Sequence, residues 1–301
     1  MKAKFRIKKL DKEKISSPFS AIVFVVLIIY SITLIYPMVW AFLSTFKSYY
    51  EFNNNIIGFP KNFVLDNYVI AITKFKVAVR SADAVRAVKL PMMFLYSFLL
   101  SGGCAFASAI SHFVAAYATA KFSDWKFSKI LTSVVVFCMV LPIVGNLPSS
   151  LQMARVLGLY DKIWGSWIRS ASFMGIYFLV LQGMISGVPK AFDEAAKIDG
   201  ANNWTIMFKI NFPMVFNILQ TIFLLQFIAS WNGFREAMLY LPSYPVVAYG
   251  LYLMFKSSDN TLVTVTIKLT CTMLLLIPML TLFICFHKKL MGNLTVGGLK
   301  G

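Results

Sequence analysis

Six long runs of apolar residues divide this chain, and polar segments of unequal length separate them. Because an α-helix rises about 1.5 Å per residue, about 20 apolar residues are enough to cross a hydrocarbon layer of about 30 Å. Each run therefore predicts one transmembrane helix, and the pattern as a whole predicts an all-α integral membrane protein with six transmembrane helices. The runs lie at residues 19–46, 90–120, 130–147, 164–187, 214–239 and 263–286.

Neither an internal repeat nor an uncharged linker separates these runs into groups. We therefore predict one transmembrane domain over residues 19–288, preceded by a basic arm at 1–18 and followed by a short tail at 289–301. The positions of the basic residues predict the orientation of this domain, since cytoplasmic loops are enriched in Lys and Arg. The arm, two loops and the tail carry roughly sixteen Lys and Arg, against about three in the loops 148–163 and 240–262. Both termini and the loop 188–213 are therefore predicted to be cytoplasmic, although the longer loop 47–89 is also basic.

The composition agrees with a membrane protein and argues against nucleic-acid binding. Hydrophobic residues make up 58% of the 301 residues and charged residues 14%, whereas a soluble domain carries about 25% charged residues. A net charge of +17 would suit a nucleic-acid-binding protein, but the basic residues lie between apolar runs. We therefore expect membrane lipid, and not nucleic acid, around this chain.

The loop 188–213 has the most ordered pattern of charges in the second half of the chain. Pro189 suits the first position of a helix, where its missing N–H costs nothing. Asp193 and Glu194 follow in the early turns, where carboxylates complement the helix dipole. Gly200 suits a left-handed residue at the end of this helix. We predict a first short helix that ends at Gly200.

A second short helix is predicted after Gly200. Asn202 or Asn203 can cap its first turn, and we expect it to end near residues 212–213, at the next proline. Two short helices with a bend between them would form a compact unit with a face of small residues.

This loop resembles the EAA loop of ABC-importer permeases. That family pattern has Glu-Ala-Ala, then Gly, then Ile-x-Leu-Pro after a fixed gap, and a longer form with Ile-Asp-Gly-Ala is typical of the carbohydrate branch. The match covers about twenty residues, with Phe212 in place of the usual Leu, so chance agreement is a poor explanation. The matching residues, to which the resemblance assigns coupling to an ATPase, are Glu194, Ala195, Ala196, Asp199, Gly200, Ala201, Ile210, Phe212 and Pro213, with Ile198 completing the longer form.

Other segments are similar to sugar permeases of the same family. Residues 62–68 resemble a Phe-x-Leu-x-Asn-Tyr stretch after the first span, and residues 231–234 resemble Trp-Asn-Asp-Phe with Gly233 in place of the acid. The end of the chain, 290–301, resembles the tail of the second, six-span permease of maltose-type importers. The resemblance covers most of the chain from residue 62 onward, but residues 69–91 are longer and more basic than the family pattern.

The resemblance implies a type I ABC-importer permease fold and the function of a sugar-import subunit. It also implies four kinds of partner: a second permease, an ATPase dimer, an extracytoplasmic sugar-binding protein and a sugar substrate. The expected location is the cytoplasmic membrane of a bacterium or archaeon. Transport would proceed by ATP-driven alternating access.

The chain lacks the motifs of an enzyme or an ATPase. No Gly-x-x-x-x-Gly-Lys-Ser/Thr phosphate-binding loop occurs, so we expect ATP and Mg²⁺ to be bound by a separate subunit. The four cysteines fall inside apolar runs without metal-ligand spacing, so we predict no metal site, cofactor or catalytic residue in this chain. Arg169 lies in the outer part of its run, where its side chain can extend to the membrane interface. Arg235 and Glu236 lie at the outer end of the fifth run, where we interpret them as interfacial anchors and not as gating residues.

The polar residues of the fifth run leave two interpretations open. Neutral polar groups in a span can bind sugar hydroxyls, or they can hydrogen-bond to a neighbouring helix. We name Gln226, Ser230, Trp231 and Asn232 as candidates for the translocation path. An importer of peptides, amino acids or polyols remains an alternative. A stand-alone secondary transporter or channel is a further alternative, which the lack of carboxylates within the spans disfavours.

Overall fold

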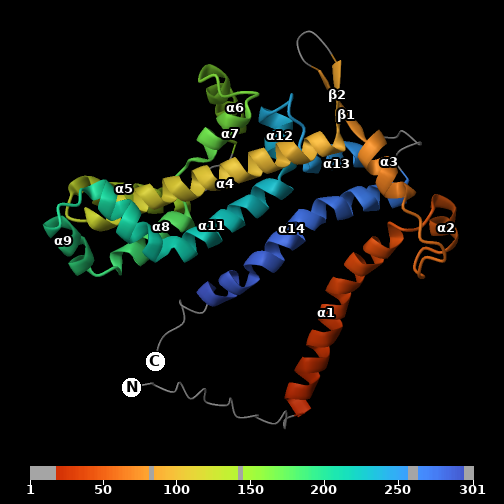
Figure 1. The fold of residues 1–301 in the computed structure, drawn as a ribbon, viewed down its shortest axis with the longest axis horizontal. Helices are drawn as coiled ribbons and strands as arrows, with labels where there is room; N and C mark the ends of the chain where they lie inside the picture. The colour runs from red at the N-terminus through yellow and green to blue at the C-terminus, as the bar shows by residue number, and fades with distance from the viewer. Residues whose placement is uncertain (1–17, 81–84, 142–144, 257–263, 295–301) are drawn as a thin grey trace.

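The structure is a computed structural model of the chain and describes residues 18–80, 85–141, 145–256 and 264–294. The predicted N-terminal arm up to residue 17, and the tail from residue 295, lie outside the described residues. Four helical stretches in the described part are long and apolar enough to cross a membrane (Figure 1). These four match the predicted first, second, fifth and sixth spans. They are α1 (Pro18–Ser44), α4 (Leu90–Lys121), the continuous stretch Asn203–Asn232, and α14 (Val265–Leu294).

The third and fourth predicted spans are interrupted. The 130–147 run holds α5 (Lys126–Val140) and the start of α6 (Leu147–Val156), and the 164–187 run holds α7 (Ile163–Ser170) and α8 (Ile176–Ser186). Gly175, which precedes α8, has φ 136°, a conformation that residues with a side chain rarely adopt. Hydrophobicity alone hides this break, because the residues around it remain apolar.

The fifth span is longer than predicted at its start. α10 (Asn203–Thr205) continues through a π-helical segment, η1 (Ile206–Asn211), into α11 (Phe212–Asn232). The prediction that a second short helix ends near 212–213 is therefore wrong. The wide π turn, in which the Phe212 N–H bonds to the Met207 carbonyl, precedes Pro213 and lets the helix continue past a residue with no N–H. At its far end the helix stops at Gly233, which separates α11 from α12 (Phe234–Tyr240).

The basic loop 47–89 contains regular structure. Two short helices precede an antiparallel hairpin, in which Lys76 pairs with Lys89 and Val77 with Val88. The hairpin consists of β1 (Lys76–Arg80) and β2 (Val85–Lys89). It lies at one end of the molecule beside α3 (Asp66–Lys74) and α13 (Val247–Lys256), far from α9 (Lys190–Ile198) at the opposite end (Figure 1). The two short helices before the hairpin are α2 (Tyr49–Asn54) and α3.

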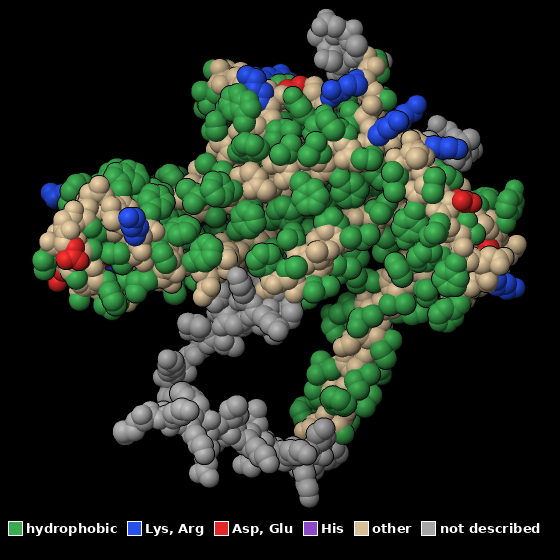
Figure 2. Space-filling view, in the orientation of Figure 1, with side chains coloured by type: hydrophobic (Ala, Val, Ile, Leu, Met, Phe, Trp, Pro, Cys, Tyr) green, Lys and Arg blue, Asp and Glu red, His purple; other side chains and the backbone are tan. Residues whose placement is uncertain are grey.

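The long helices pack through two main apolar clusters and expose apolar side chains outward. One cluster joins the hairpin and α13 to the N-terminal halves of α4 and α14, around Met93 and Leu251. The other joins α4, α8 and α11 around Phe113, Phe178 and Leu219. Figure 2 shows apolar side chains over the middle of the molecule and charged ones concentrated at its ends and upper edge. An apolar belt of this kind suits a protein surrounded by lipid.

Small residues in α4 allow one close approach. A Cβ added at Gly103 would collide with the indole of Trp167 in α7, whereas one at Gly102 would meet open space. Trp167 also donates from Nε1 to the carbonyl of Leu99 at 3.0 Å. The glycine at position 103 is therefore what lets α7 lie directly against α4.

Candidate functional site

The loop 188–213 folds largely as its sequence predicts. α9 spans Lys190–Ile198, and Pro189 is the capping residue immediately before it, one position earlier than predicted. Gly200 has φ +81°, the left-handed conformation expected at the bend. The side chain of Asn202 accepts a hydrogen bond from the N–H of Thr205 at 2.8 Å, so the predicted cap begins the second helix.

Most of α9 faces outward. Phe192 is 50% exposed, Ile198 87% and Trp204, in the neighbouring α10, 66%. Glu194 and Ala195 are also exposed, while Ala196 and Ala201 are half-buried. Large apolar side chains, a carboxylate and small residues thus share one solvent-facing unit at the end of the molecule. Exposed apolar groups of this density favour a protein-docking surface.

The other sequence-predicted residues of this loop hold its base. Ile210 and Phe212 are half-buried, and Pro213 is exposed beside them. The ring of Phe212 lies edge-on to Phe113 of α4, with ring centroids 5.3 Å apart. The motif therefore divides into an exposed part in and just after α9, including Asp199 and Gly200, and a packed part where η1 meets α11.

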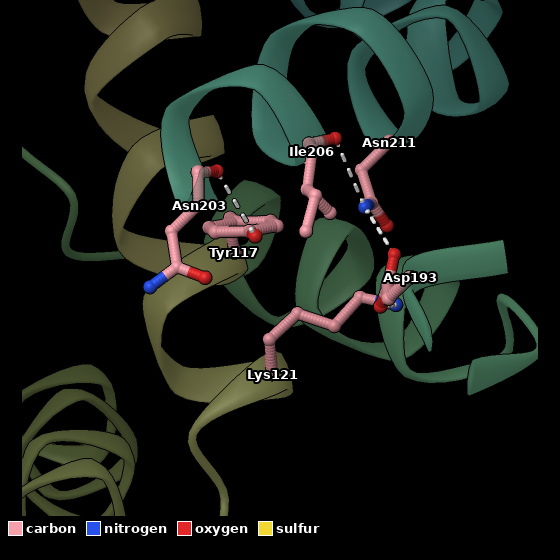
Figure 3. A network of polar contacts seen from close by, with 6 residues as sticks. All are labelled: Tyr117, Lys121, Asp193, Asn203, Ile206 and Asn211. Carbon is pink, nitrogen blue, oxygen red and sulfur yellow. Dashed lines mark hydrogen bonds and ion pairs between the residues drawn. The ribbon is translucent and has the colours of Figure 1, made fainter. Parts of the chain in front are cut away.

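A polar network that the sequence analysis did not identify holds α9 in place through its buried side (Figure 3). Asp193 is buried, with Lys121 Nζ 2.6 Å from its Oδ2 and Asn211 Nδ2 donating to its Oδ1 at 2.9 Å. The Asn211 amide also donates to the Ile206 carbonyl at 3.3 Å. One carboxylate thereby joins α9 to the end of α4 and to η1.

A second contact in Figure 3 joins α4 to the start of the following helix. The hydroxyl of Tyr117 donates to the carbonyl of Asn203 at 3.4 Å. Between these contacts lies a small cavity of about 210 Å³, lined by polar groups that include Lys121, Asp193 and Glu194. The sequence carried one local signal for this network, the aspartate itself, which had been assigned only to the helix dipole.

The four candidates for a translocation path lie near the far end of α11. Gln226 and Ser230 are half-buried, and Asn232 is exposed with its amide donating to the Ile228 carbonyl of its own helix at 3.1 Å. Trp231 is 1% exposed and donates from Nε1 to the Leu275 carbonyl of α14 at 3.1 Å. Trp231 therefore acts in helix packing here, and the role of the other three in transport stays a prediction.

Comparison with known proteins places these features in a family. Residues 112–290, more than half of the chain, match the family described as "binding-protein-dependent transport system inner membrane component". The melibiose/raffinose/stachyose import permease protein MelC of Bacillus subtilis is 25% identical over 224 residues, covering 73% of this chain and 80% of MelC. The diacetylchitobiose uptake system permease protein NgcG of Streptomyces coelicolor is 25% identical over 218 residues, covering 72% of this chain and 67% of NgcG.

The fold itself also has a solved counterpart. A chain from the crystal structure of a bacterial ABC transporter, described as involved in the import of the acidic polysaccharide alginate, superimposes with a TM-score of 0.77 at 21% sequence identity. The superposition covers 90% of this chain and 95% of that one. At this identity the match establishes the fold, and the family match is an independent finding.

Proposed function

Because the chain belongs to the family of binding-protein-dependent transport system inner membrane components, we propose that it is the permease subunit of an ABC importer for a sugar or oligosaccharide. The observation that carries the proposal is the exposed α9 unit, bent at Gly200 and placed at one end of a bundle of membrane-spanning helices. The relatives named for melibiose, raffinose, stachyose and diacetylchitobiose favour a sugar over a peptide, amino acid or polyol.

The proposed machine needs partners that this chain does not supply. We expect a second permease, an ATPase dimer that binds ATP and Mg²⁺, and an extracytoplasmic binding protein that delivers the sugar. The proposed topology has six spans, with the interrupted α5–α6 and α7–α8 segments forming the third and fourth. The arm 1–18, the tail 289–301 and the 188–213 loop would lie in the cytoplasm around the domain 19–288, as the distribution of Lys and Arg supports.

The proposed mechanism is mechanical and uses no reacting group of this chain. ATP closes the ATPase dimer, the docked α9 units move with it, and the permease pair opens to the outside; hydrolysis reverses the movement. The ATPase contributes the free energy, and the permease contributes two alternative packings of its helices. Glu194, Ala195, Asp199 and Gly200 would meet the ATPase, and Ile210, Phe212 and Pro213 would form the base that carries the movement into α11.

Reconstitution tests the proposal directly. The purified chain alone in vesicles should neither transport sugar nor hydrolyse ATP, whereas the chain with its second permease, ATPase and binding protein should take up sugar only with ATP. Ion-driven uptake by the single chain would overturn the importer assignment and favour a secondary transporter.

A further inference from the structure

Asp193 is the one buried residue of α9. The other side chains of this helix are exposed or half-buried, so hydrophobic burial does little to hold the helix in place. A helix of nine residues is also too short to be stable by itself in water. The position and order of α9 must therefore depend on polar contacts, and Asp193 makes the strongest of these.

Both oxygens of the Asp193 carboxylate are used. Oδ2 lies 2.6 Å from the Lys121 ammonium, and Oδ1 accepts from the Asn211 amide at 2.9 Å. The side chains of Lys121 and Asp193 are only 11% and 12% exposed, so water screens this ion pair weakly. A buried carboxylate without these partners would be strongly disfavoured, so the burial of Asp193 depends on the present position of α9.

The Asn211 amide can face Asp193 in only one orientation. Its Nδ2 donates to the carboxylate and to the Ile206 carbonyl, while its Oδ1 is buried without a hydrogen-bond partner. Rotating the amide by 180° would place Oδ1 against the carboxylate oxygen and would remove both bonds. The structure therefore leaves one amide acceptor unsatisfied in order to direct a donor at Asp193. Asn211 ends the π-helical segment immediately before α11, so this donor links α9 to that long helix.

We propose that Asp193 is the positioning residue that makes α9 move as one body with α4 and α11. Lys121 at the end of α4 and Asn211 before α11 are its two partners, so a displacement of the exposed face of α9 passes through one carboxylate into both long helices. The inference rests on the proposed function, since it assumes that an ATPase displaces α9. Glu194, one residue further on, is exposed, whereas Asp193 is buried.

The packing of α4 and α11 explains why these two helices are the ones joined. They lie side by side from the α9 end toward the hairpin end (Figure 1) and share the apolar cluster around Phe113 and Leu219. A movement delivered at their α9 end would therefore reach the opposite end of the molecule without bending a loop. If α9 could tilt freely on its connections, the same movement would be lost within residues 188–202.

The first test measures the position of α9 in the purified permease and needs no partner. Spin labels would be placed at Ala195 of α9 and at Ala118 of α4, both exposed, in a chain whose four cysteines are replaced by alanine. We expect a narrow distance distribution in the parent chain and a broad one in Asp193→Asn, which has the same shape without the charge. Lys121→Met should also broaden it, and Lys121→Arg should keep it narrow. A narrow distribution in Asp193→Asn would overturn the proposal.

The second test uses the assembled importer. Asp193→Asn should reduce sugar uptake at least about tenfold and bring sugar-stimulated ATP hydrolysis close to its unstimulated rate, and the exchange Asp193→Lys with Lys121→Asp should restore part of both. Asp124→Asn, an exposed carboxylate in the turn after α4, is the matched control and should leave both unchanged. Normal coupling in Asp193→Asn would refute the positioning role. Failure of the unmodified chain to bind an ATPase would instead refute the proposed function.

Discussion

Arg169 of α7 and Glu236 of α12 form an ion pair, with Nη1 2.6 Å from Oε1. The same carboxylate oxygen accepts a hydrogen bond from Ser166 at 2.8 Å, and the guanidinium carbon lies 3.3 Å from the ring centroid of Tyr240. The sequence analysis assigned both side chains to the membrane interface and did not predict that they form a pair. The ion pair joins α12, which follows the break at Gly233, to α7, which precedes the break at 171–175.

Breaking this pair should destabilise the fold moderately. The two side chains are 25% and 32% exposed, so we expect Arg169→Met or Glu236→Gln to cost about 1 kcal/mol, with a similar coupling energy in the double variant. Thermal unfolding in detergent measures the cost. Arg235→Met, an exposed neighbour in the same helix, is the control and should change the unfolding temperature little. Equal effects of Arg235→Met and Arg169→Met would show that the pair contributes nothing specific.

Gly200 should tolerate residues according to their backbone preference and not their size. A Cβ at this position meets no atom within 4 Å, but φ of +81° costs a residue with a side chain about 1–2 kcal/mol. We expect Gly200→Val to weaken co-purification of the ATPase and to abolish sugar-stimulated hydrolysis, while the chain still inserts into the membrane. Gly200→Asn should be close to the parent, because asparagine adopts left-handed conformations more easily. Equal behaviour of the two variants would contradict a conformational role.

Glu194 should act at the docked surface. It is exposed on α9, and a carboxylate there can form a charge-assisted hydrogen bond with a basic residue of an ATPase. We expect Glu194→Lys to fold and insert normally but to lose most of the co-purifying ATPase, whereas Glu194→Gln should lose less. The measurement is the ratio of ATPase to permease after affinity purification. Wild-type ratios in both variants would remove Glu194 from the docking surface.

Substitutions at Trp231 and Asn232 should distinguish a role in helix packing from a role in sugar transport. Trp231→Phe removes the hydrogen bond from the indole to the Leu275 carbonyl of α14. We therefore expect a loss of about 1 kcal/mol of stability. Asn232→Leu should alter sugar uptake while assembly persists, if this exposed amide lines the path. Uptake rates and unfolding temperatures of both variants provide the test. Loss of assembly in Asn232→Leu would favour a role between helices.

Single-cysteine variants should report the orientation of the chain in the membrane. In a background without native cysteines, Asn54→Cys should react with a membrane-impermeant reagent in intact cells, and Asn202→Cys should react only after the cells are opened. Both residues are exposed, so access to the reagent depends on the side of the membrane. Asn260, a further site predicted to be external, lies outside the described residues. External labelling at Asn202 would contradict both the predicted topology and the coupling role of α9.

Local chemistry was predictable and long-range chemistry was not. The bend at Gly200 and the cap at Asn202 depend on residues within one turn, so the sequence predicts both. The length of an apolar run was enough to locate α1, α4 and α14. The break at 171–175 was missed because its residues are as apolar as the helices beside it.

The contacts that hold the site together are long-range contacts, which the sequence did not predict. Asp193 meets Lys121 and Asn211 only because α9 folds against the ends of two other helices, and no periodicity in the sequence reports such a meeting. The continuation of the helix through Pro213 was missed for a similar reason. A proline predicts the end of a helix unless a π turn makes room for it, and a π turn has no reliable sequence signal.

The hairpin has a consequence for how neighbouring copies of this protein behave in a crowded membrane. Among the described residues its sheet has two strands, so both β1 and β2 are edge strands, each with one row of backbone groups that the sheet itself does not pair. Such rows recruit strands from other molecules and begin aggregates. Lys76 and Lys89, opposite each other and both exposed, place two positive charges at the base of the hairpin. Charged side chains on an edge strand, lysines above all, disfavour the addition of a further strand, so these two lysines oppose association of adjacent copies through the hairpin.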